Sequence, residues 1–257
     1  MQTLRVVNCS KYYKKNGSAF CALQETDLTV AGGRFISIIG PSGCGKSTLF
    51  NIIAGLTQPS TGRVLLAGKD ITGESGHVGY MLQKDLLLPW RTILDNVIIG
   101  LEIHGITKKE ARRRALPMLR KYGLGGFEYD HPDALSGGMR QRAGLIRTLL
   151  NDRNIILLDE PFGALDAQTR LRMQNWLLEI WNDFRKTVLF VTHDIDEAIY
   201  LSDEIIVLTS RPGRIKARIE VGLPRPRNQR TLLADRFLTL KRELLLMLRA
   251  GDGAPSS

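Results

Sequence analysis

The sequence predicts an α/β fold whose core is a parallel β-sheet covered by helices on both faces. In the second half of the chain, unbroken apolar runs typical of fully buried strands alternate with segments of helical periodicity. A glycine-rich loop at residues 40–47 joins an apolar strand to a helix, as in sheets that bind ligands at their carboxyl edge. With 257 residues, 43% of them hydrophobic, the chain can bury a full core as one large domain or two subdomains.

The predicted elements form three blocks along the chain. Residues 4–39 alternate short apolar runs with turns, which predicts a β-rich start ending in a buried strand at 35–39. Residues 63–81 add two strands around a turn at 68–70, and residues 90–120 change to helical spacing. The last block is predicted to contain helices at 137–150, 167–184 and 195–201 and strands at 155–158, 187–191 and 205–208.

The loop Gly40-Pro41-Ser42-Gly43-Cys44-Gly45-Lys46-Ser47 matches G-x-x-x-x-G-K-[ST] at every position. Its glycines let backbone N–H groups approach phosphates, Lys46 can reach the β- and γ-phosphates, and the Ser47 hydroxyl can hold Mg²⁺. The loop is predicted to open a helix, whose dipole favours an anion. A dinucleotide-binding loop is disfavoured, because Thr48 stands where the third glycine would be needed.

Polar residues follow two further predicted strands. Asp159 and Glu160 end the apolar run at 155–158, where Asp159 can order Mg²⁺ and Glu160 can orient or deprotonate an attacking water. His193 follows the run at 187–191 and is placed to contact a γ-phosphate. The next residue, Asp194, is predicted to cap a helix, with Glu197 completing a capping box.

The charge distribution and the cysteines indicate the chain's surroundings. The net charge is +10, and the segment from Arg211 to Ala250 holds 11 Lys and Arg against three acids. This excess favours an anionic membrane surface over nucleic acid, because the segment holds a single aromatic residue, Phe237, beside its arginines. The three scattered cysteines suit a reducing cytosol, and neither a signal peptide nor a run of about 18 apolar residues is present.

Taken in order, the motifs resemble the ATPase subunit of ABC transporters, and the resemblance covers residues 4–230. It rests on the phosphate loop 40–47, Gln83, the signature-like loop 135–142, the acids 159–160, the segment 163–166 and His193. It implies a P-loop NTPase with a RecA-like parallel sheet core, an N-terminal antiparallel β subdomain and an inserted α-helical subdomain at approximately 88–145. Residues 231–257 would form a basic C-terminal helix and a disordered tail.

The resemblance also implies a composite site for ATP and Mg²⁺ shared by two copies of the chain. The implied catalytic residues are Glu160, His193, Lys46 and Gln83, and the implied Mg²⁺ ligands are Ser47, Gln83 and Asp159. The implied nucleotide contacts are Tyr13, Gly40, Pro41, Ser42, Gly43, Cys44, Gly45, Lys46, Ser47, Thr48, Ser136, Gly137, Gly138 and Asp166. Tyr12 or Phe20 is the alternative to Tyr13 for stacking on adenine. Ser136–Gly138 would cap the γ-phosphate held by the second copy, and Asp166 would cross the dimer interface.

Three segments, 88–97, 211–215 and 223–227, resemble importers of nitrate, sulfonate, taurine and thiamine-pyrimidine precursors. The resemblance therefore implies a peripheral protein on the cytoplasmic face of the inner membrane. Its partners would be a second copy, an integral membrane permease and, indirectly, an extracytoplasmic solute-binding protein. The alternatives are a soluble ABC ATPase and the ATPase subunit of an exporter. Met139 and Gly163 depart from the usual signature Gln and D-loop Ser, and neither change removes a phosphate ligand.

Overall fold

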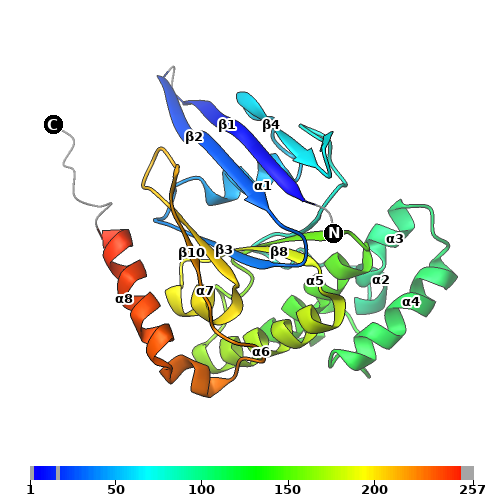
Figure 1. Ribbon diagram of the computed structural model, residues 1–257. Helices are drawn as coiled ribbons and strands as arrows, with labels where there is room; N and C mark the ends of the chain where they lie inside the picture. The colour runs from blue at the N-terminus through cyan, green and yellow to red at the C-terminus, as the bar shows by residue number, and fades with distance from the viewer. Residues whose placement is uncertain (1–2, 16–17, 250–257) are drawn as a thin grey trace.

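Two β-sheets organise the protein, whose computed structural model describes residues 3–15 and 18–249 (Figure 1). The larger sheet has the order β10-β9-β3-β8-β7-β6, with every pair parallel except β10–β9. Its strands are β3 (Phe35–Ile39), β6 (Gly79–Met81), β7 (Ile155–Asp159), β8 (Thr187–Val191), β9 (Glu204–Leu208) and β10 (Ile215–Glu220). The antiparallel sheet contains β1 (Leu4–Lys15), β2 (Ser18–Val30), β4 (Thr61–Leu66) and β5 (Lys69–Asp70), in the order β2-β1-β4-β5.

Helices cover the larger sheet on both faces (Figure 1). The α-helices are α1 (Lys46–Ile53), α2 (Ile93–Val97), α3 (Ile99–Ile103), α4 (Lys108–Lys121), α5 (Gly137–Leu150), α6 (Ala167–Phe184), α7 (Ile195–Leu201) and α8 (Asp235–Arg249). Two short 3₁₀ helices, η1 (Pro132–Ala134) and η2 (Gln229–Leu233), lie in connections. The predicted α/β class is confirmed, and the helices predicted at 137–150, 167–184 and 195–201 have the predicted bounds.

One local prediction was wrong. Residues 69 and 70 do not form a turn but pair with β4 as β5, and the chain reverses at Ala67 and Gly68, which both adopt positive φ. The helical block predicted at 90–120 is confirmed. It consists of α2, α3 and α4, and a loop with Gly105 at φ +77° precedes α4. The predicted apolar spacing was also correct, since the residues that define it are all buried: Ile93, Val97, Leu101, Ala111, Ala115 and Leu119.

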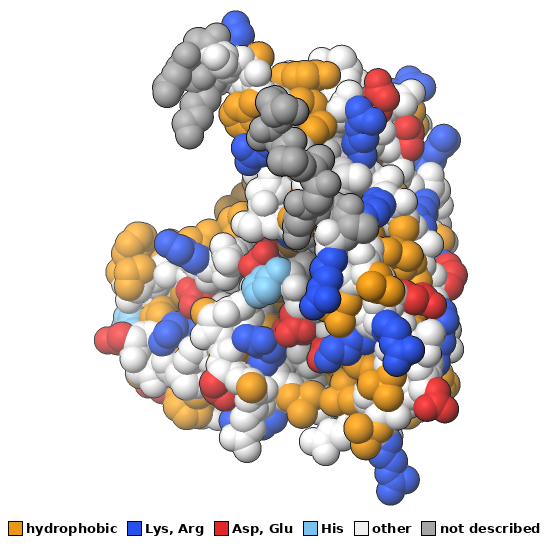
Figure 2. Space-filling view, turned by 90° about the vertical axis from the view of Figure 1, so that its left-hand side faces the viewer, with side chains coloured by type: hydrophobic (Ala, Val, Ile, Leu, Met, Phe, Trp, Pro, Cys, Tyr) orange, Lys and Arg blue, Asp and Glu red, His pale blue; other side chains and the backbone are white. Residues whose placement is uncertain are grey.

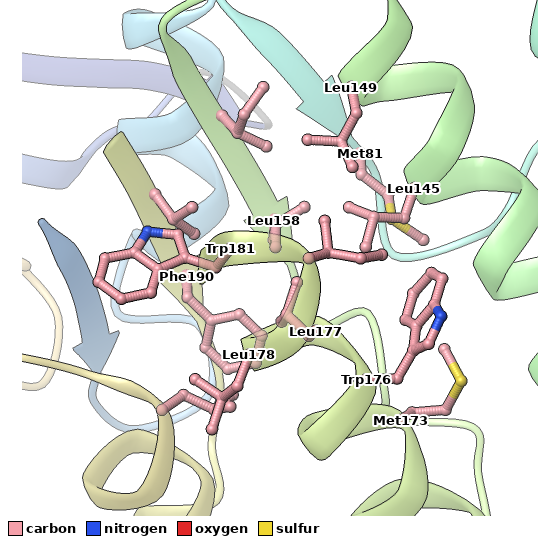
Figure 3. Packing of buried hydrophobic residues seen from close by; sticks show 14 of the residues in the cluster. Met81, Leu145, Leu149, Leu158, Met173, Trp176, Leu177, Leu178, Trp181 and Phe190 are labelled. Atoms are coloured by element: carbon pink, nitrogen blue, oxygen red, sulfur yellow. The ribbon is translucent and has the colours of Figure 1, made fainter. Parts of the chain in front are cut away.

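Two hydrophobic clusters hold these layers together. One packs α5, α6, α7 and α8 against one face of the larger sheet. Figure 3 shows part of it, where side chains of α6 such as Leu177 and Trp181 meet Leu158 of β7 and Phe190 of β8. The other cluster encloses α1 between the two sheets, through residues such as Phe50. The helix that follows the phosphate loop is therefore fixed from both sides by apolar packing.

A fully buried asparagine fixes the segment that enters the helical region. Asn96 of α2 accepts a hydrogen bond from the Leu88 N–H at 2.6 Å. Its amide nitrogen donates to the carbonyls of Leu88, Arg91 and Thr92, each at 3.0 Å. Because one side chain satisfies four backbone groups, residues 88–92 hold a defined shape without regular secondary structure.

A charged cluster ties α2 to α4. The Asp95 carboxylate lies 2.8 Å from Lys108 Nζ and 2.8 Å from Arg112 Nη2, and its side chain is only 14% exposed. Partial burial raises the pKa of Asp95, but the hydrogen bonds from Lys108 and Arg112 prevail and hold this pKa below its ordinary value. The ionised carboxylate therefore stabilises this helix pair.

The basic C-terminal segment is largely engaged in contacts with the rest of the chain. Arg218 pairs with Glu204 at 2.6 Å, Arg225 with Asp203 at 2.8 Å, and Lys241 of α8 with Asp196 at 2.7 Å. Buried Arg227 donates to the carbonyls of Ile199, Tyr200 and Leu223. On the face that carries α8, Lys and Arg side chains are interspersed with acidic and hydrophobic ones (Figure 2). The predicted disordered tail lies outside the described residues.

Within the described ranges, no helix combines the length and the apolar character needed to cross a membrane.

We predict that Asp95→Asn destabilises the protein by about 1–3 kcal/mol at neutral pH, because the substitution leaves Lys108 and Arg112 without their anion. The folded-state pKa of Asp95 is lowered, so its contribution is present above the ordinary value of about 4 and lost as the pH falls through the folded-state pKa. Urea unfolding at several pH values measures the difference. The matched control is Asp133→Asn, which makes the same change at an exposed carboxylate of η1 and leaves the unfolding curve unchanged. Equal effects of both variants at every pH would contradict the prediction.

Candidate functional site

The candidate site is a cavity of about 660 Å³ at the carboxyl edge of the larger sheet. Four neighbouring strands, β3, β8, β7 and β6, end at this edge. The cavity is lined by Tyr13, Phe20, Ala22, Ser42, Gly43, Gly45, Lys46, Ser47, Thr48, Gln83, Glu160, His193 and Arg211. Residues from both sheets thus surround the N-terminus of α1, where the helix dipole favours an anion.

The phosphate loop requires glycine at two positions. Gly45 has φ +102°, and a Cβ on it would lie 2.6 Å from the carbonyl oxygen of Ala22 in β2. Gly43 has φ +73°, a conformation that residues with a side chain rarely adopt. At Gly45 the loop therefore packs directly against the backbone of the antiparallel sheet.

Lys46 is a buried cation whose nearest hydrogen-bond acceptors are neutral carbonyls. Its side chain is almost fully buried, and Nζ donates to the carbonyl oxygens of Gly40 at 2.8 Å and Pro41 at 3.0 Å. Among the described residues, Lys46 forms no ion pair with an acid. A buried charge of this kind is stabilised by a counter-ion, so the geometry favours an anionic ligand in the adjoining cavity.

Asp159 lies at the end of β7 with its carboxylate turned to the start of α1. Burial raises the pKa of Asp159, and the charge of Glu160 acts in the same direction, against hydrogen bonds from Ser47 and Tyr80. Tyr80 Oη lies 3.4 Å from Asp159 Oδ2. The Ser47 hydroxyl and this carboxylate are adjacent hard oxygen donors, a set that fits Mg²⁺ bound together with phosphate oxygens.

The side chains of Gln83 and His193 both lie close to one carboxylate oxygen of Glu160. Glu160 Oε2 lies 3.4 Å from Gln83 Nε2 and 3.2 Å from His193 Nδ1. Glu160 itself has φ +45°, an uncommon conformation for a residue with a side chain, and its N–H donates to the Val191 carbonyl. Three elements distant in the sequence therefore present their polar groups at one point of the cavity.

The aromatic residues predicted to stack on adenine lie in the hairpin of β1 and β2. Tyr13 and Phe20 face each other across β1 and β2, with stacked rings and centroids 5.7 Å apart, and both line the cavity. Tyr12, one of the two alternatives, is not among the lining residues. The structure thus leaves Tyr13 and Phe20 as the aromatic surfaces available to a ligand.

Some predicted site residues lie elsewhere. Ser136 caps α5 by accepting a hydrogen bond from the Met139 N–H, and Asp166 caps α6 by accepting one from Thr169. None of Ser136, Gly137, Gly138 or Asp166 lines the cavity at Lys46. Gly40, Pro41 and Cys44 belong to the phosphate loop but also lie outside the lining set, the first two supplying acceptors to Lys46.

The predicted helix cap after His193 is confirmed, but the capping box is not. Asp194 accepts hydrogen bonds from the N–H groups of Asp196 and Glu197. The buried Glu197 carboxylate instead accepts from Thr192 and Gln174, and the Asp194 N–H donates to Thr192 Oγ1. These contacts fix the turn that carries His193 between β8 and α7.

Sequence reasoning missed two parts of the site. Tyr80, which reaches Asp159, appeared only as one residue of a strand. Arg211, which lines the cavity, was considered only as part of the basic C-terminal segment and of the importer-like segment 211–215, and not as a site residue. The hydrogen bond between Arg211 and Gly43 joins residues 168 positions apart, so no local pattern announces it.

Comparison with known proteins identifies a family. A family model described as ABC transporter matches residues 23–163. An uncharacterised ABC transporter ATP-binding protein of Methanocaldococcus jannaschii is 48% identical over 96% of this chain and 91% of its own length. A taurine import ATP-binding protein of Yersinia pestis is 47% identical over 78% of this chain and 79% of its own. An aliphatic sulfonates import ATP-binding protein of Bacillus cereus is 40% identical over 97% of both chains.

A solved structure shows the same fold. It is a dimeric ATP-binding cassette in a post-hydrolysis state, bound to ADP and Pi. It superimposes with a TM-score of 0.75 at 32% identity, covering 86% of this chain and all of the other.

We predict that Asp159→Asn raises the melting temperature of the nucleotide-free protein by a few degrees at neutral pH. The raised pKa means that ionised Asp159 opposes folding above its folded-state pKa, an effect that vanishes as the group protonates in acid. Thermal unfolding of both proteins with a chelator present, from neutral to acidic pH, measures the gain. A gain that grows on acidification would contradict this assignment.

Proposed function

The chain belongs to the ABC transporter family, and we propose that it is the ATP-hydrolysing subunit that powers import of a small solute into the cell. The observation that carries the proposal is buried Lys46, held by neutral carbonyls beside a cavity into which Glu160, Gln83 and His193 point. This arrangement suits a polyphosphate that is bound at the loop and cleaved next to a carboxylate.

The names of the relatives support a sulfonate as the imported solute. Two relatives are named for import of taurine and of aliphatic sulfonates, and they are 47% and 40% identical to this chain. Transport would need an integral membrane permease and an extracytoplasmic solute-binding protein as partners. The subunit would then act at the cytoplasmic face of the inner membrane.

Binding would begin at the loop and α1. The N–H groups of residues 42–48 surround the phosphates, and Lys46 exchanges its carbonyl contacts for phosphate oxygens. Tyr13 offers its ring to the adenine base. Ser47 and Asp159, with Gln83 alongside, would hold Mg²⁺, which when bound neutralises phosphate charge.

Hydrolysis would depend on Glu160. Its carboxylate orients a water molecule and accepts the water's proton as the water attacks the γ-phosphate, while the bond from the γ-phosphorus to the bridging oxygen breaks and ADP leaves with that oxygen. Gln83 and His193 keep Glu160 Oε2 in place before the nucleotide arrives, and His193 is then positioned to contact the γ-phosphate. The chain supplies positioning and charge stabilisation, which dominate phosphoryl transfer.

A second copy would complete the site. Ser136, Gly137 and Gly138 begin α5, and no acidic side chain lies in that helix's first turn. This helix N-terminus lies outside the cavity of its own chain and suits the γ-phosphate bound by the partner. Asp166 at the start of α6 would cross the same interface. Two ATP molecules would therefore be held between two head-to-tail copies.

We predict that Lys46→Ala weakens ATP binding at least tenfold, because the variant removes the buried cation that faces the phosphates. Titration calorimetry with a non-hydrolysable ATP analogue measures the affinity. Lys69→Ala, which removes an exposed charge in the β4–β5 hairpin, retains wild-type affinity. Unchanged affinity of Lys46→Ala would contradict the assignment of the phosphate site.

We predict that Glu160→Gln binds ATP, loses turnover by at least a hundredfold and accumulates as a dimer, since closure no longer ends in hydrolysis. Wild-type ATPase activity is expected to rise more steeply than linearly with protein concentration. Size-exclusion chromatography with ATP and steady-state ATPase assays measure both effects.

The control is Glu179→Gln on the exposed face of α6, which retains wild-type turnover. Full activity of Glu160→Gln would refute the role of Glu160. Activity strictly linear in protein, from monomers alone, would refute the shared site.

A further inference from the structure

The connection between β9 and β10 reaches into the candidate nucleotide cavity. Residues 209–214 connect β9 to the edge strand β10, and one of them, Arg211, lines the cavity. None of the residues proposed to bind or hydrolyse ATP belongs to this loop. It is nevertheless the segment that brings a charged side chain from the C-terminal part of the chain to the phosphate loop.

Backbone contacts hold this loop against strand β2 and against the phosphate loop. The Gly213 N–H donates to the Ala22 carbonyl at 3.1 Å, and the Gln24 N–H donates to the Gly213 carbonyl at 2.9 Å. A Cβ on Gly213 would lie 1.9 Å from the carbonyl oxygen of Cys44, so only glycine fits against the phosphate loop.

The loop also braces itself. Thr209 Oγ1 donates to the Pro212 carbonyl at 2.9 Å and accepts from the Arg214 N–H at 3.0 Å. The position of Arg211 is therefore set by a fixed backbone on each side and not by its own side chain alone.

The guanidinium of Arg211 lies between the aromatic pair and the phosphate loop. Its Nε and Nη2 atoms lie 3.3 Å and 3.2 Å from the Gly43 carbonyl oxygen. Its central carbon lies 5.1 Å from the centroid of the Phe20 ring, within cation–π range. Within the described part of the chain, Arg211 forms no salt bridge, so its charge is balanced by a carbonyl and a ring only.

We propose that Arg211 is a nucleotide-binding residue that contacts the ribose–phosphate part of ATP. The inference rests on the proposed function, in which the base lies at Tyr13 and the phosphates lie at the loop. A nucleotide spanning these two places passes its ribose and α-phosphate through the region between Phe20 and Gly43. Arg211 occupies that region with an exposed cation.

The chemistry of arginine suits this position. One face of the guanidinium stays on the Phe20 ring, while N–H groups that now donate to Gly43 can turn to an oxygen of the nucleotide. Lys46 is buried and Arg211 is exposed, and both line the cavity. Planar, charge-assisted donors bind such oxygens more strongly than neutral donors do.

The experiment compares two arginines of the same loop. Arg214 is exposed, donates to Gln24 Oε1 at 3.1 Å and does not line the cavity. Affinities for ADP and for a non-hydrolysable ATP analogue, each with Mg²⁺, are measured by titration calorimetry. Arg211→Ala is expected to weaken both about tenfold or more, because both ligands share the ribose and α-phosphate. Arg214→Ala removes the same charge and stays within about twofold of wild type.

Arg211→Lys keeps the charge without the planar guanidinium and is expected to weaken binding severalfold. This variant also decides the question if Arg211→Ala does not fold. Wild-type affinity in Arg211→Lys, or in Arg211→Ala, overturns the proposal, and so does a loss confined to the ATP analogue. In those cases weak binding by Lys46→Ala leaves the proposed function intact. A wild-type protein that binds neither ligand refutes the proposed function, and the role of Arg211 with it.

Discussion

Parallel pairing of β3, β8 and β7 is the constraint on which the site depends. Val191 pairs with Ile38 on one side and with Asp159 on the other, so the three strands end at the same level. The ladder continues one residue further, because the Glu160 N–H donates to the Val191 carbonyl and the Thr192 N–H to the Ile38 carbonyl. Backbone hydrogen bonds therefore place the residues that follow each strand side by side.

The charges gathered at this edge are poorly balanced within the chain itself. Lys46 faces carbonyls, while the carboxylates of Asp159 and Glu160 lie close enough for Glu160 to raise the pKa of Asp159. Such an arrangement weakens the empty protein and favours a ligand that brings both phosphate oxygens and a metal cation. The apolar packing of α1 between the two sheets compensates, since it fixes the phosphate loop whether or not a ligand is bound.

Local patterns predicted most of the fold and the phosphate side of the site. The loop at 40–47, the acids after β7 and the bounds of α6 were readable because each depends on neighbours in sequence. Side-chain hydrogen bonds outside regular secondary structure could not be predicted. Asn96 binds four backbone groups of residues 88–92, which follow no repeating pattern, and Arg211 binds Gly43, 168 positions away. The predicted capping box is absent for a similar reason, because the buried Glu197 carboxylate accepts hydrogen bonds from Thr192 and Gln174 instead.

Three parts of the structure hold the phosphate loop in place. Strand β3 and helix α1 fix it covalently, the Ala22 carbonyl of β2 excludes any side chain at Gly45, and the Cys44 carbonyl packs against Gly213 of the β9–β10 loop. Under the proposed function, a nucleotide bound to this loop would touch parts of the chain that come from both sheets. The N-terminus of α5 lies outside the cavity of its own chain, and in the proposed dimer it would approach the phosphates bound by the partner.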